Sequence, residues 1–128
     1  MSTWESGRES GLLDDIIAGR KTIEGRLNKG KFAEYKVGDK VSLRRDIRGH
    51  DGLLRDGEPN AAVVEVAAIR LYSDFITMVT EEGFQNVIPN AKNAQAAADE
   101  YNKFYTFDDQ QTYGVLAIEI SYGGPTTQ

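Results

Sequence analysis

A lysine, a glutamate and an arginine lie within six positions of one another in the stretch Gly19–Arg26, which reads GRKTIEGR. Lys21, Glu24 and Arg26 have the functional groups of a hydrolytic site. The carboxylate can act as a base or orient a water, and the two cations can steady negative charge that develops on a substrate. Charged residues of this kind also line the solvated edges of many strands, so the stretch alone leaves both interpretations open.

The residues around this stretch indicate how it is held. Ser10 is a good N-cap for an amphipathic helix over residues 11–18. A strand is expected to follow over residues 21–27. On a regular strand Lys21 and Glu24 point to opposite faces, so they can act together only if the strand bends or a ligand bridges them.

Positive charge is concentrated in one part of the chain. Residues 20–48 contain ten Lys or Arg and four acids, a formal charge of +6 in a chain whose total is −5. This distribution predicts a positive face on an acidic body, which suits an anionic ligand. A basic hairpin that only improves solubility has the same composition.

The composition excludes several kinds of site. The chain has no cysteine and one histidine, His50, so disulfides, thiolate nucleophiles and zinc sites built from Cys and His are excluded. No segment approaches the roughly 20 apolar residues of a membrane helix, and residues 1–10 lack the pattern of a signal peptide. We therefore expect a soluble, cytoplasmic protein without a metal or a cofactor, and the sequence leaves its oligomeric state open.

At 128 residues the chain is expected to form one domain over residues 10–121, between a flexible N-terminus over residues 1–9 and a flexible tail over residues 122–128. The remaining pattern predicts strands over residues 40–47, 61–72 and 115–121, helices over residues 74–82, with Ser73 as the cap, and 93–105, and loops over residues 48–60 and 84–92. This mixture indicates an α+β fold. The single histidine falls in the first of these loops, where we expect it to be exposed.

Several side chains carry expectations of their own. The apolar run over residues 61–72 predicts a strand buried on both faces at the centre of the sheet. Glu65 interrupts that run, and if it is buried it needs Arg45 or Arg26 as a partner. Alternation places Arg45 inward together with the apolar Ile47. We expect the arginine either to extend its charged group to solvent at the end of the strand or to point into a wet cleft beside an acid or a ligand.

The helix expected over residues 93–105 carries small and then aromatic side chains at helical spacing. Its aromatic end consists of Tyr101, Phe104 and Tyr105. Such a stripe predicts packing against the core rather than a platform for stacking a ligand.

The stretch GRKTIEGR matches the pattern Gly-x-Lys-x-x-Glu-x-Arg of the ASCH family without a gap. Further landmarks follow in the family's order, and they extend from Ser10 to Ile120: the preceding helix, Val37-Gly38-Asp39 before a strand, a helix containing Phe75, and the segment from Tyr113 to Ile118. On these residues the chain resembles the ASCH family over nearly its whole length.

The resemblance implies a small PUA-like mixed β-barrel with helices packed around it and a cleft lined by the Lys, Glu and Arg of the motif. Family members are linked to RNA. Some are enzymes that cleave single-stranded RNA or remove the acyl group of N4-acetylcytidine. The expected partner is therefore single-stranded RNA or a modified pyrimidine nucleoside, which the protein is expected to hydrolyse. The alternative is a non-catalytic RNA-binding module. A protein-interaction domain has no specific support in the sequence.

The resemblance also implies roles for individual residues. Lys21 matches the catalytic lysine of the deacetylating members, while the position of their threonine nucleophile is occupied here by Glu24, which can serve as a base for water. Arg26 is expected to position a phosphate or a carbonyl. The family's downstream glutamate is matched by Glu81 or Glu82, and the sequence does not choose between them.

Binding of RNA would involve further residues. We expect four cations to hold backbone phosphates, namely Lys29, Lys31, Arg44 and Arg45, and Tyr72 to offer a face on which a base can stack.

Overall fold

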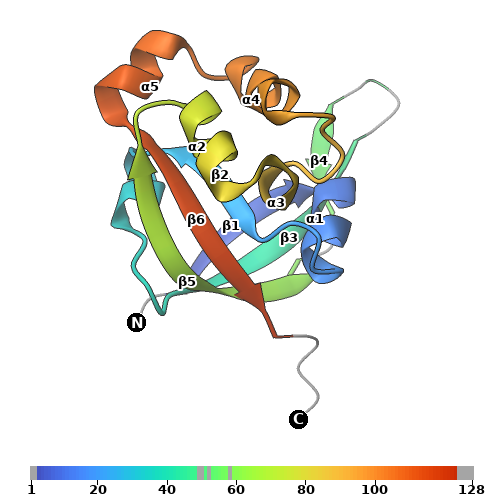
Figure 1. The fold of residues 1–128 in the computed structure, drawn as a ribbon. Coiled ribbons are helices and arrows are strands. Elements are labelled where there is room, and N and C mark those ends of the chain that lie inside the picture. Colours follow the sequence, from blue (N-terminus) through green and yellow to red (C-terminus); the bar gives the residue numbers. More distant parts are fainter. Residues whose placement is uncertain (1–2, 49–50, 52, 58, 124–128) are drawn as a thin grey trace.

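A curved mixed sheet with helices on its outer side forms the frame of the computed structural model, which describes residues 3–48, 51, 53–57 and 59–123 (Figure 1). The elements are, in chain order, β1 (Thr3–Glu9), α1 (Ser10–Ile17), β2 (Ile23–Leu27), the 3-10 helix η1 (Gly30–Glu34), β3 (Lys40–Arg48), β4 (Leu54–Asp56), β5 (Ala62–Tyr72), α2 (Phe75–Glu82), α3 (Phe84–Val87), α4 (Ala94–Asn102), α5 (Phe107–Tyr113) and β6 (Val115–Tyr122). The predicted α+β class is confirmed.

The order of the strands brings two distant parts of the chain to the edges of the sheet. The strands run β1-β3-β5-β6-β2, with β4 paired to β3; β1 and β3 are parallel and the other pairs are antiparallel. Between the edge strands β1 and β2, the described residues form no backbone ladder. Instead, Arg8 of β1 and Glu24 of β2 form a buried ion pair of 2.8 Å, so side chains join the two edges.

The core has two parts, one on each face of the sheet. Inside the curve lie residues of α1, β3, β5 and β6 together with Tyr35. On the outer face, α2, α3 and α4 cover β2 and β6 and form a second cluster around Phe75 and Met78. As a result β6 is buried on both faces from Val115 to Ile118.

The prediction that residues 61–72 are buried on both faces is wrong. The first half of β5 alternates between buried and exposed residues, because the helices leave its outer face to solvent. Glu65 lies on that face and pairs with Lys40 at 2.9 Å rather than with Arg45 or Arg26.

The prediction that residues 1–9 lack regular structure is wrong for Thr3–Glu9, which form β1. The strand is anchored by Trp4, whose indole Nε1 donates to Asp39 Oδ2 at 2.9 Å and whose ring lies 5.1 Å from that of Tyr35. Its sequence shows no apolar alternation, because polar side chains of this strand also point inward. At the other end Tyr122 belongs to β6, and residues 124–128 lie outside the described part.

The helices differ from expectation in three places. Asp74 rather than Ser73 caps α2, since its side chain accepts a hydrogen bond from the Thr77 amide at 2.9 Å. The expected loop over residues 84–92 begins with the short helix α3. The helix expected over residues 93–105 ends at Asn102, and a separate helix, α5, follows it.

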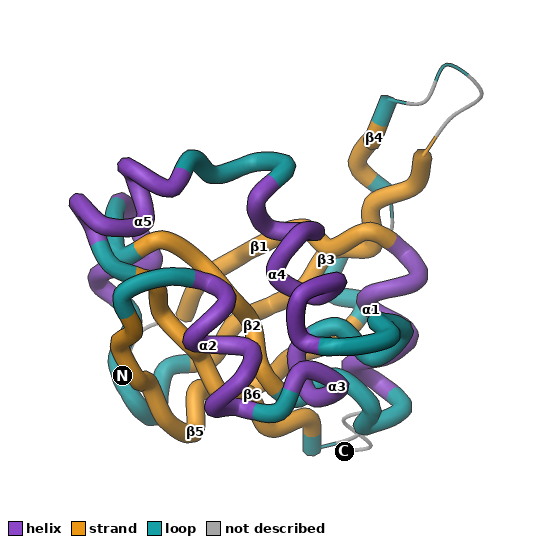
Figure 2. Tube along the Cα trace, turned by 45° about the horizontal axis from the view of Figure 1, so that its top comes forward, coloured by secondary structure: helices purple, strands orange, loops and turns teal. Residues whose placement is uncertain are grey.

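The β3–β4 hairpin projects from the rest of the molecule (Figure 2). Ile47, which was expected to point inward, is 53% exposed because this part of β3 extends beyond the core. The residues expected to form a loop contain β4, and His50 lies outside the described residues. Within the part of the chain that the structure describes, no helix is long and apolar enough to cross a membrane.

Candidate functional site

Glu24 lies at the centre of a buried group of charges that we call the Glu24 cluster: Arg8, Lys21, Glu24 and Arg26. Its Oε2 is 2.8 Å from Arg8 Nη2 and 3.3 Å from Arg26 Nη2, and its Oε1 is 3.8 Å from Lys21 Nζ. Burial opposes ionisation of this carboxyl, but the three cations outweigh it and lower the pKa of Glu24 to about 2. Glu24 is therefore an anion at neutral pH.

Lys21 lies in the loop before β2 rather than on the strand itself. The prediction that it points away from Glu24 is wrong for this reason: alternation begins only at Ile23. The Lys21 ammonium donates to the carbonyls of Ile23 at 2.9 Å and Val87 at 2.5 Å. Burial lowers its pKa to about 8, although the charge of Glu24 favours the protonated form.

Arg8 is the member of the cluster that the sequence did not reveal. Its guanidinium donates to Ser6 Oγ at 2.6 Å and to the Gly7 carbonyl at 2.7 Å, in addition to its contact with Glu24. Burial lowers the pKa of Arg8, but an arginine keeps its charge at neutral pH. The cluster therefore holds three cations around one carboxylate, and this excess of positive charge favours a further anionic group.

Three polar atoms in or beside the cluster are buried without a hydrogen-bond partner among the described residues, namely Arg8 Nε, Glu24 Oε1 and Tyr35 Oη. All three residues line an interior cavity of about 10 Å³. A cavity of that volume is about the size of one water molecule.

Gly25 explains how an aromatic wall comes to lie beside the cluster. A Cβ atom at this position would lie only 2.8 Å from Met78 Cε and Tyr101 Cζ, so α4 can pack this closely on β2 only where the strand has no side chain. The Tyr101 ring in turn stacks on the Phe75 ring, with the centroids 4.3 Å apart, and the centroid of the Tyr105 ring lies 5.3 Å from that of Phe75.

The Glu24 cluster and this aromatic wall enclose a cleft of about 340 Å³. The cleft is lined by Arg8, Leu12, Lys21, Glu24, Arg26, Ile88, Glu100, Tyr101, Phe104 and Tyr105. Its volume is in the range of sites for small molecules. The aromatic end of the helix expected over residues 93–105 was predicted to pack in the core, but Phe104, which follows α4, is 79% exposed and lines the cleft.

Among the residues predicted to bind phosphates, the structure separates the lysines from the arginines. Lys29 and Lys31 line a second hollow of about 420 Å³, which we call the outer hollow. Arg44 is held by Asp46 through two hydrogen bonds of 2.6 and 3.1 Å. Arg45 contacts Asp14 at 3.0 Å and Ser10 Oγ at 2.6 Å, so it reaches an acid as expected, and neither arginine is among the residues that line the cleft or the outer hollow.

Tyr72 and Glu82 belong to a different group of charges, which we call the Glu82 network: Arg70, Tyr72, Glu82 and Glu119. Arg70 donates to both oxygens of Glu82 at 2.6 and 2.7 Å and to Glu119 at 2.8 Å, and the Tyr72 hydroxyl donates to Glu82 at 2.6 Å. None of these residues lines the cleft, and Glu81 is exposed. The downstream glutamate that does line the cleft is Glu100 of α4.

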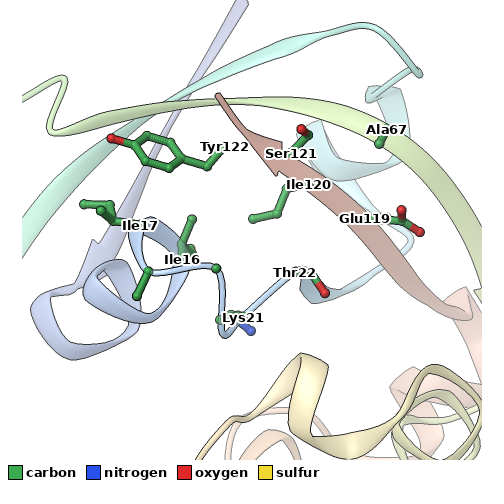
Figure 3. A pocket seen from close by; sticks show the side chains of 11 residues that line it. Ile16, Ile17, Lys21, Thr22, Ala67, Glu119, Ile120, Ser121 and Tyr122 are labelled. Atoms are coloured by element: carbon green, nitrogen blue, oxygen red, sulfur yellow. The ribbon is translucent and has the colours of Figure 1, made fainter. Parts of the chain in front are cut away.

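A third hollow, of about 520 Å³, lies on the other side of the loop that carries Lys21 (Figure 3). Its lining comes mainly from the end of α1 and from β6, including Ile17, Glu119 and Tyr122. Lys21 is the only cation among the residues that line it, and its ammonium is bound to the carbonyls of Ile23 and Val87. The charges that suit an anionic ligand thus lie in the cleft. Across the described residues, no group of three or more His, Asp or Glu side chains is placed to hold a metal ion.

The fold, the motif on β2 and the cleft beside it define the class of protein. The ASCH domain model matches residues 11–122, and the chain belongs to the ASCH family. Arg8 lies before the matched region, so this member of the cluster is contributed by a strand outside the family match.

Solved structures support the same fold. The chain is 34% identical to the hypothetical protein PH0355, with a TM-score of 0.77 over 94% of this chain and 98% of the other. It is also 34% identical to protein PF0455 from Pyrococcus furiosus, with a TM-score of 0.74 over 94% and 97% of the two chains. Protein EF3133 from Enterococcus faecalis, 15% identical with a TM-score of 0.58 over 95% and 76% of the two chains, shares the fold. No curated protein matches the sequence.

Proposed function

We propose that the cleft binds a pyrimidine base, either of single-stranded RNA or of a modified nucleoside, and that Glu24 accepts a hydrogen bond from an N–H group of that base. One observation carries this proposal. Glu24 Oε1 is buried but accepts no hydrogen bond from any described residue, and it is the oxygen nearer to Lys21, which lines the cleft. A buried carboxylate oxygen left in this state favours a ligand that supplies a donor.

The other walls of the cleft fit the same ligand. The exocyclic amino group of cytosine is a donor that Glu and Asp side chains accept in nucleic-acid complexes. Tyr101, Phe104 and Tyr105 offer aromatic surface for the faces of a base. Arg26 lines the same cleft and can donate to the carbonyl oxygen of a pyrimidine.

Ligands with and without an N4–H donor test this proposal without altering the protein. We expect cytidine to bind more tightly than N4,N4-dimethylcytidine, which lacks the N4–H group, by about tenfold or more because the Glu24 oxygen would again be left unpaired. Calorimetric or NMR titration of each nucleoside measures the difference. Equal affinity for the two would overturn the role of Glu24 as the acceptor.

Hydrolysis is the second candidate function, and the lowered pKa of Lys21 favours it. At a pKa of about 8, an appreciable fraction of Lys21 is neutral near physiological pH. In that form its two N–H groups can donate to the carbonyls of Ile23 and Val87, and its lone pair can take a proton from an attacking water. With a pKa of about 2, Glu24 is a weaker base and is better suited to binding.

In N4-acetylcytidine the reaction would add water to the acetyl carbonyl and break the bond between the acetyl carbon and N4. The proton taken by Lys21 would pass to N4 of the leaving cytidine. The products are acetate and cytidine. Incubation with N4-acetylcytidine and, separately, with single-stranded RNA tests this candidate beside Lys21→Gln. We expect a rate that rises toward pH 8 and is lost in the variant. Activity that the variant retains would contradict this role, whereas binding without turnover would leave the non-catalytic module.

A further inference from the structure

The outer hollow directly adjoins the cleft. It is lined by Arg26, Leu27, Lys29, Gly30, Lys31, Phe32, Phe104, Tyr105 and Asp109. Three of these residues, Arg26, Phe104 and Tyr105, also line the cleft, so the two hollows share a common wall. A ligand that fills the cleft can therefore extend into the outer hollow past the side chain of Phe104.

Cations in the outer hollow lie over aromatic rings rather than beside carboxylates. Lys29 Nζ is 4.7 Å from the ring centroid of Tyr113, and Lys31 Nζ is 5.3 Å from that of Phe32. Over the residues that the structure describes, neither lysine forms an ion pair with a carboxylate. Both can therefore bind an anion without first releasing an acid.

Arg26 connects this charge to the cleft. Its guanidinium carbon lies 5.1 Å from the centroid of Phe32, on the side of the outer hollow, while its Nη2 contacts Glu24 on the side of the cleft. Against these three cations, Asp109 is the one acid that lines the outer hollow. Anions are favoured in a hollow with this balance of charge.

We propose that the outer hollow is a subsite for the nucleotide next to the base in the cleft, with its phosphate on Lys29 and Lys31 and its base against Phe104. This inference rests on the function proposed above and narrows it, because it makes the ligand a single-stranded oligonucleotide rather than a free nucleoside. Phe104 is a large aromatic side chain with 79% of its surface exposed. An exposed aromatic residue beside lysines that no carboxylate of the described residues neutralises is the combination that holds successive nucleotides of a single strand.

A duplex does not fit the same arrangement. The base in the cleft has to contact Glu24, whose side chain is only 4% exposed, and a paired and stacked base cannot reach that depth. A free nucleoside would fill the cleft but would leave Lys29, Lys31 and most of Phe104 unused. The two hollows together therefore match a strand of at least two nucleotides.

Binding of cytidine and of the trinucleotide CpCpC to the same variants tests the subsite. The double variant Lys29→Ala/Lys31→Ala removes the two cations, and Phe104→Ala removes the ring at the shared wall. The matched controls are Lys92→Ala and Phe107→Ala, since both residues are exposed and line neither hollow. Four of the five positions are exposed and Lys31 is partly exposed, so circular dichroism should show unchanged folding.

We expect CpCpC to bind at least tenfold more tightly than cytidine to the unaltered protein. The double lysine variant should reduce the magnitude of the slope of log K against log salt for CpCpC by about 0.7, the contribution of the one phosphate that the two lysines share, and leave the affinity for cytidine unchanged. Phe104→Ala should weaken CpCpC about tenfold through the lost stacking. The control variants should match the unaltered protein.

The outcomes separate this subsite from the function of the cleft. Equal affinity for cytidine and CpCpC, with no effect of the lysine variant, would overturn the subsite and leave the cleft proposal intact. If CpCpC binds and depends on Lys29, Lys31 and Phe104 while cytidine does not bind, the subsite is supported and the proposed role of Glu24 fails.

Discussion

Two groups of charges in this protein combine glutamate, arginine and a nearby tyrosine, and they are built in opposite ways. In the Glu82 network both oxygens of Glu82 accept hydrogen bonds from Arg70, whose side chain is 39% exposed. In the Glu24 cluster the side chains of Arg8 and Glu24 are 6% and 4% exposed, and Glu24 Oε1 has no hydrogen-bond partner among the described residues. A satisfied network ties elements together, whereas a buried and incompletely satisfied one favours a ligand.

The ratio of cations to carboxylates also differs between the Glu82 network and the Glu24 cluster. In the Glu82 network one arginine, Arg70, pairs with two glutamates, so its positive charge is fully compensated. Three cations face one carboxylate in the Glu24 cluster, beside a cleft of about 340 Å³. Both groups lower the pKa of a glutamate, whereas the adjoining cleft, the excess of cations and a carboxylate oxygen without a hydrogen bond distinguish the Glu24 cluster.

Glu24→Gln should have the largest effect of the changes that test this comparison. It preserves the shape of the side chain but leaves Arg8, Lys21 and Arg26 as buried cations around a neutral amide. Removing one partner of a buried ion pair destabilises a protein by about 3–5 kcal/mol. Urea denaturation at pH 7 should show a loss of free energy of unfolding of that size.

Glu82→Gln is the matched control for this change. The partner that it leaves behind, Arg70, is partly solvated, so solvent can replace much of the lost interaction. We expect a loss of about 1 kcal/mol, measured in the same way. Equal losses in the two variants would contradict the distinction between a buried cluster and a surface network.

Lys21 predicts a rise of stability between about pH 8 and pH 10.5, a range in which the carboxylates of the Glu82 network are already ionised and cannot produce one. The folded-state pKa of about 8 lies below the ordinary value of 10.5, so between these values the unfolded chain binds the Lys21 proton and the folded chain does not. The free energy of unfolding then increases with pH across this window, by about 3 kcal/mol when complete. Below pH 8 both states are protonated and the contribution is constant.

The difference between the unaltered protein and Lys21→Met isolates this contribution, because methionine fills a similar space and does not titrate. Urea denaturation of both proteins at pH 7, 8, 9 and 10 measures it. A difference that stays constant across this range would contradict the lowered pKa. The titration of the Lys21 Cε signal by carbon-13 NMR provides a direct check near pH 8.

Arg8→Met should have a smaller effect than Glu24→Gln, because Arg26 and Lys21 still pair with Glu24. We expect a loss of about 2 kcal/mol, the size of a hydrogen bond between charged groups, together with a higher pKa of Glu24. Arg70→Met is the control and should lose about 1 kcal/mol or less. Denaturation measures both losses, and an Arg8 variant as stable as the unaltered protein would contradict the role of this ion pair in joining β1 to β2.

The local part of the site could be predicted from the sequence, and the distant part could not. Lys21, Glu24 and Arg26 belong to one short segment, and the structure brings all three together. Arg8 comes from a polar strand whose position depends on parallel pairing with β3, and Thr3 there pairs with Lys40. Neither composition nor periodicity reports such a pairing, so an inward arginine in that strand looks like any surface charge.

The depth to which each side chain is buried was the other property that the sequence pattern did not predict. The helical spacing of Tyr101 and Phe104 places them near one face of a helix, but Tyr101 is 8% exposed and Phe104, which follows the end of α4, is 79% exposed. The order of glutamates along the chain pointed to Glu81 or Glu82, but packing leaves Glu81 exposed and directs Glu82 to Arg70. Glu100 lines the cleft because α4 lies on β2. Gly25, within the motif, is the local feature of the sequence that allows α4 to approach β2 closely.

The smallest effects should come from removing one hydroxyl group in each region, and they should differ in sign. Tyr72→Phe removes a donor to Glu82, which keeps both hydrogen bonds from Arg70, so we expect a loss of about 1 kcal/mol or less and unchanged nucleoside binding. Tyr35→Phe removes a buried hydroxyl that has no hydrogen-bond partner among the described residues, so stability should stay the same or increase. Parallel denaturation curves of the two variants measure both effects. A loss in Tyr35→Phe as large as that in Tyr72→Phe would mean that a water molecule in the 10 Å³ cavity satisfies the Tyr35 hydroxyl. The interior side of the Glu24 cluster would then be as fully hydrogen-bonded as the Glu82 network.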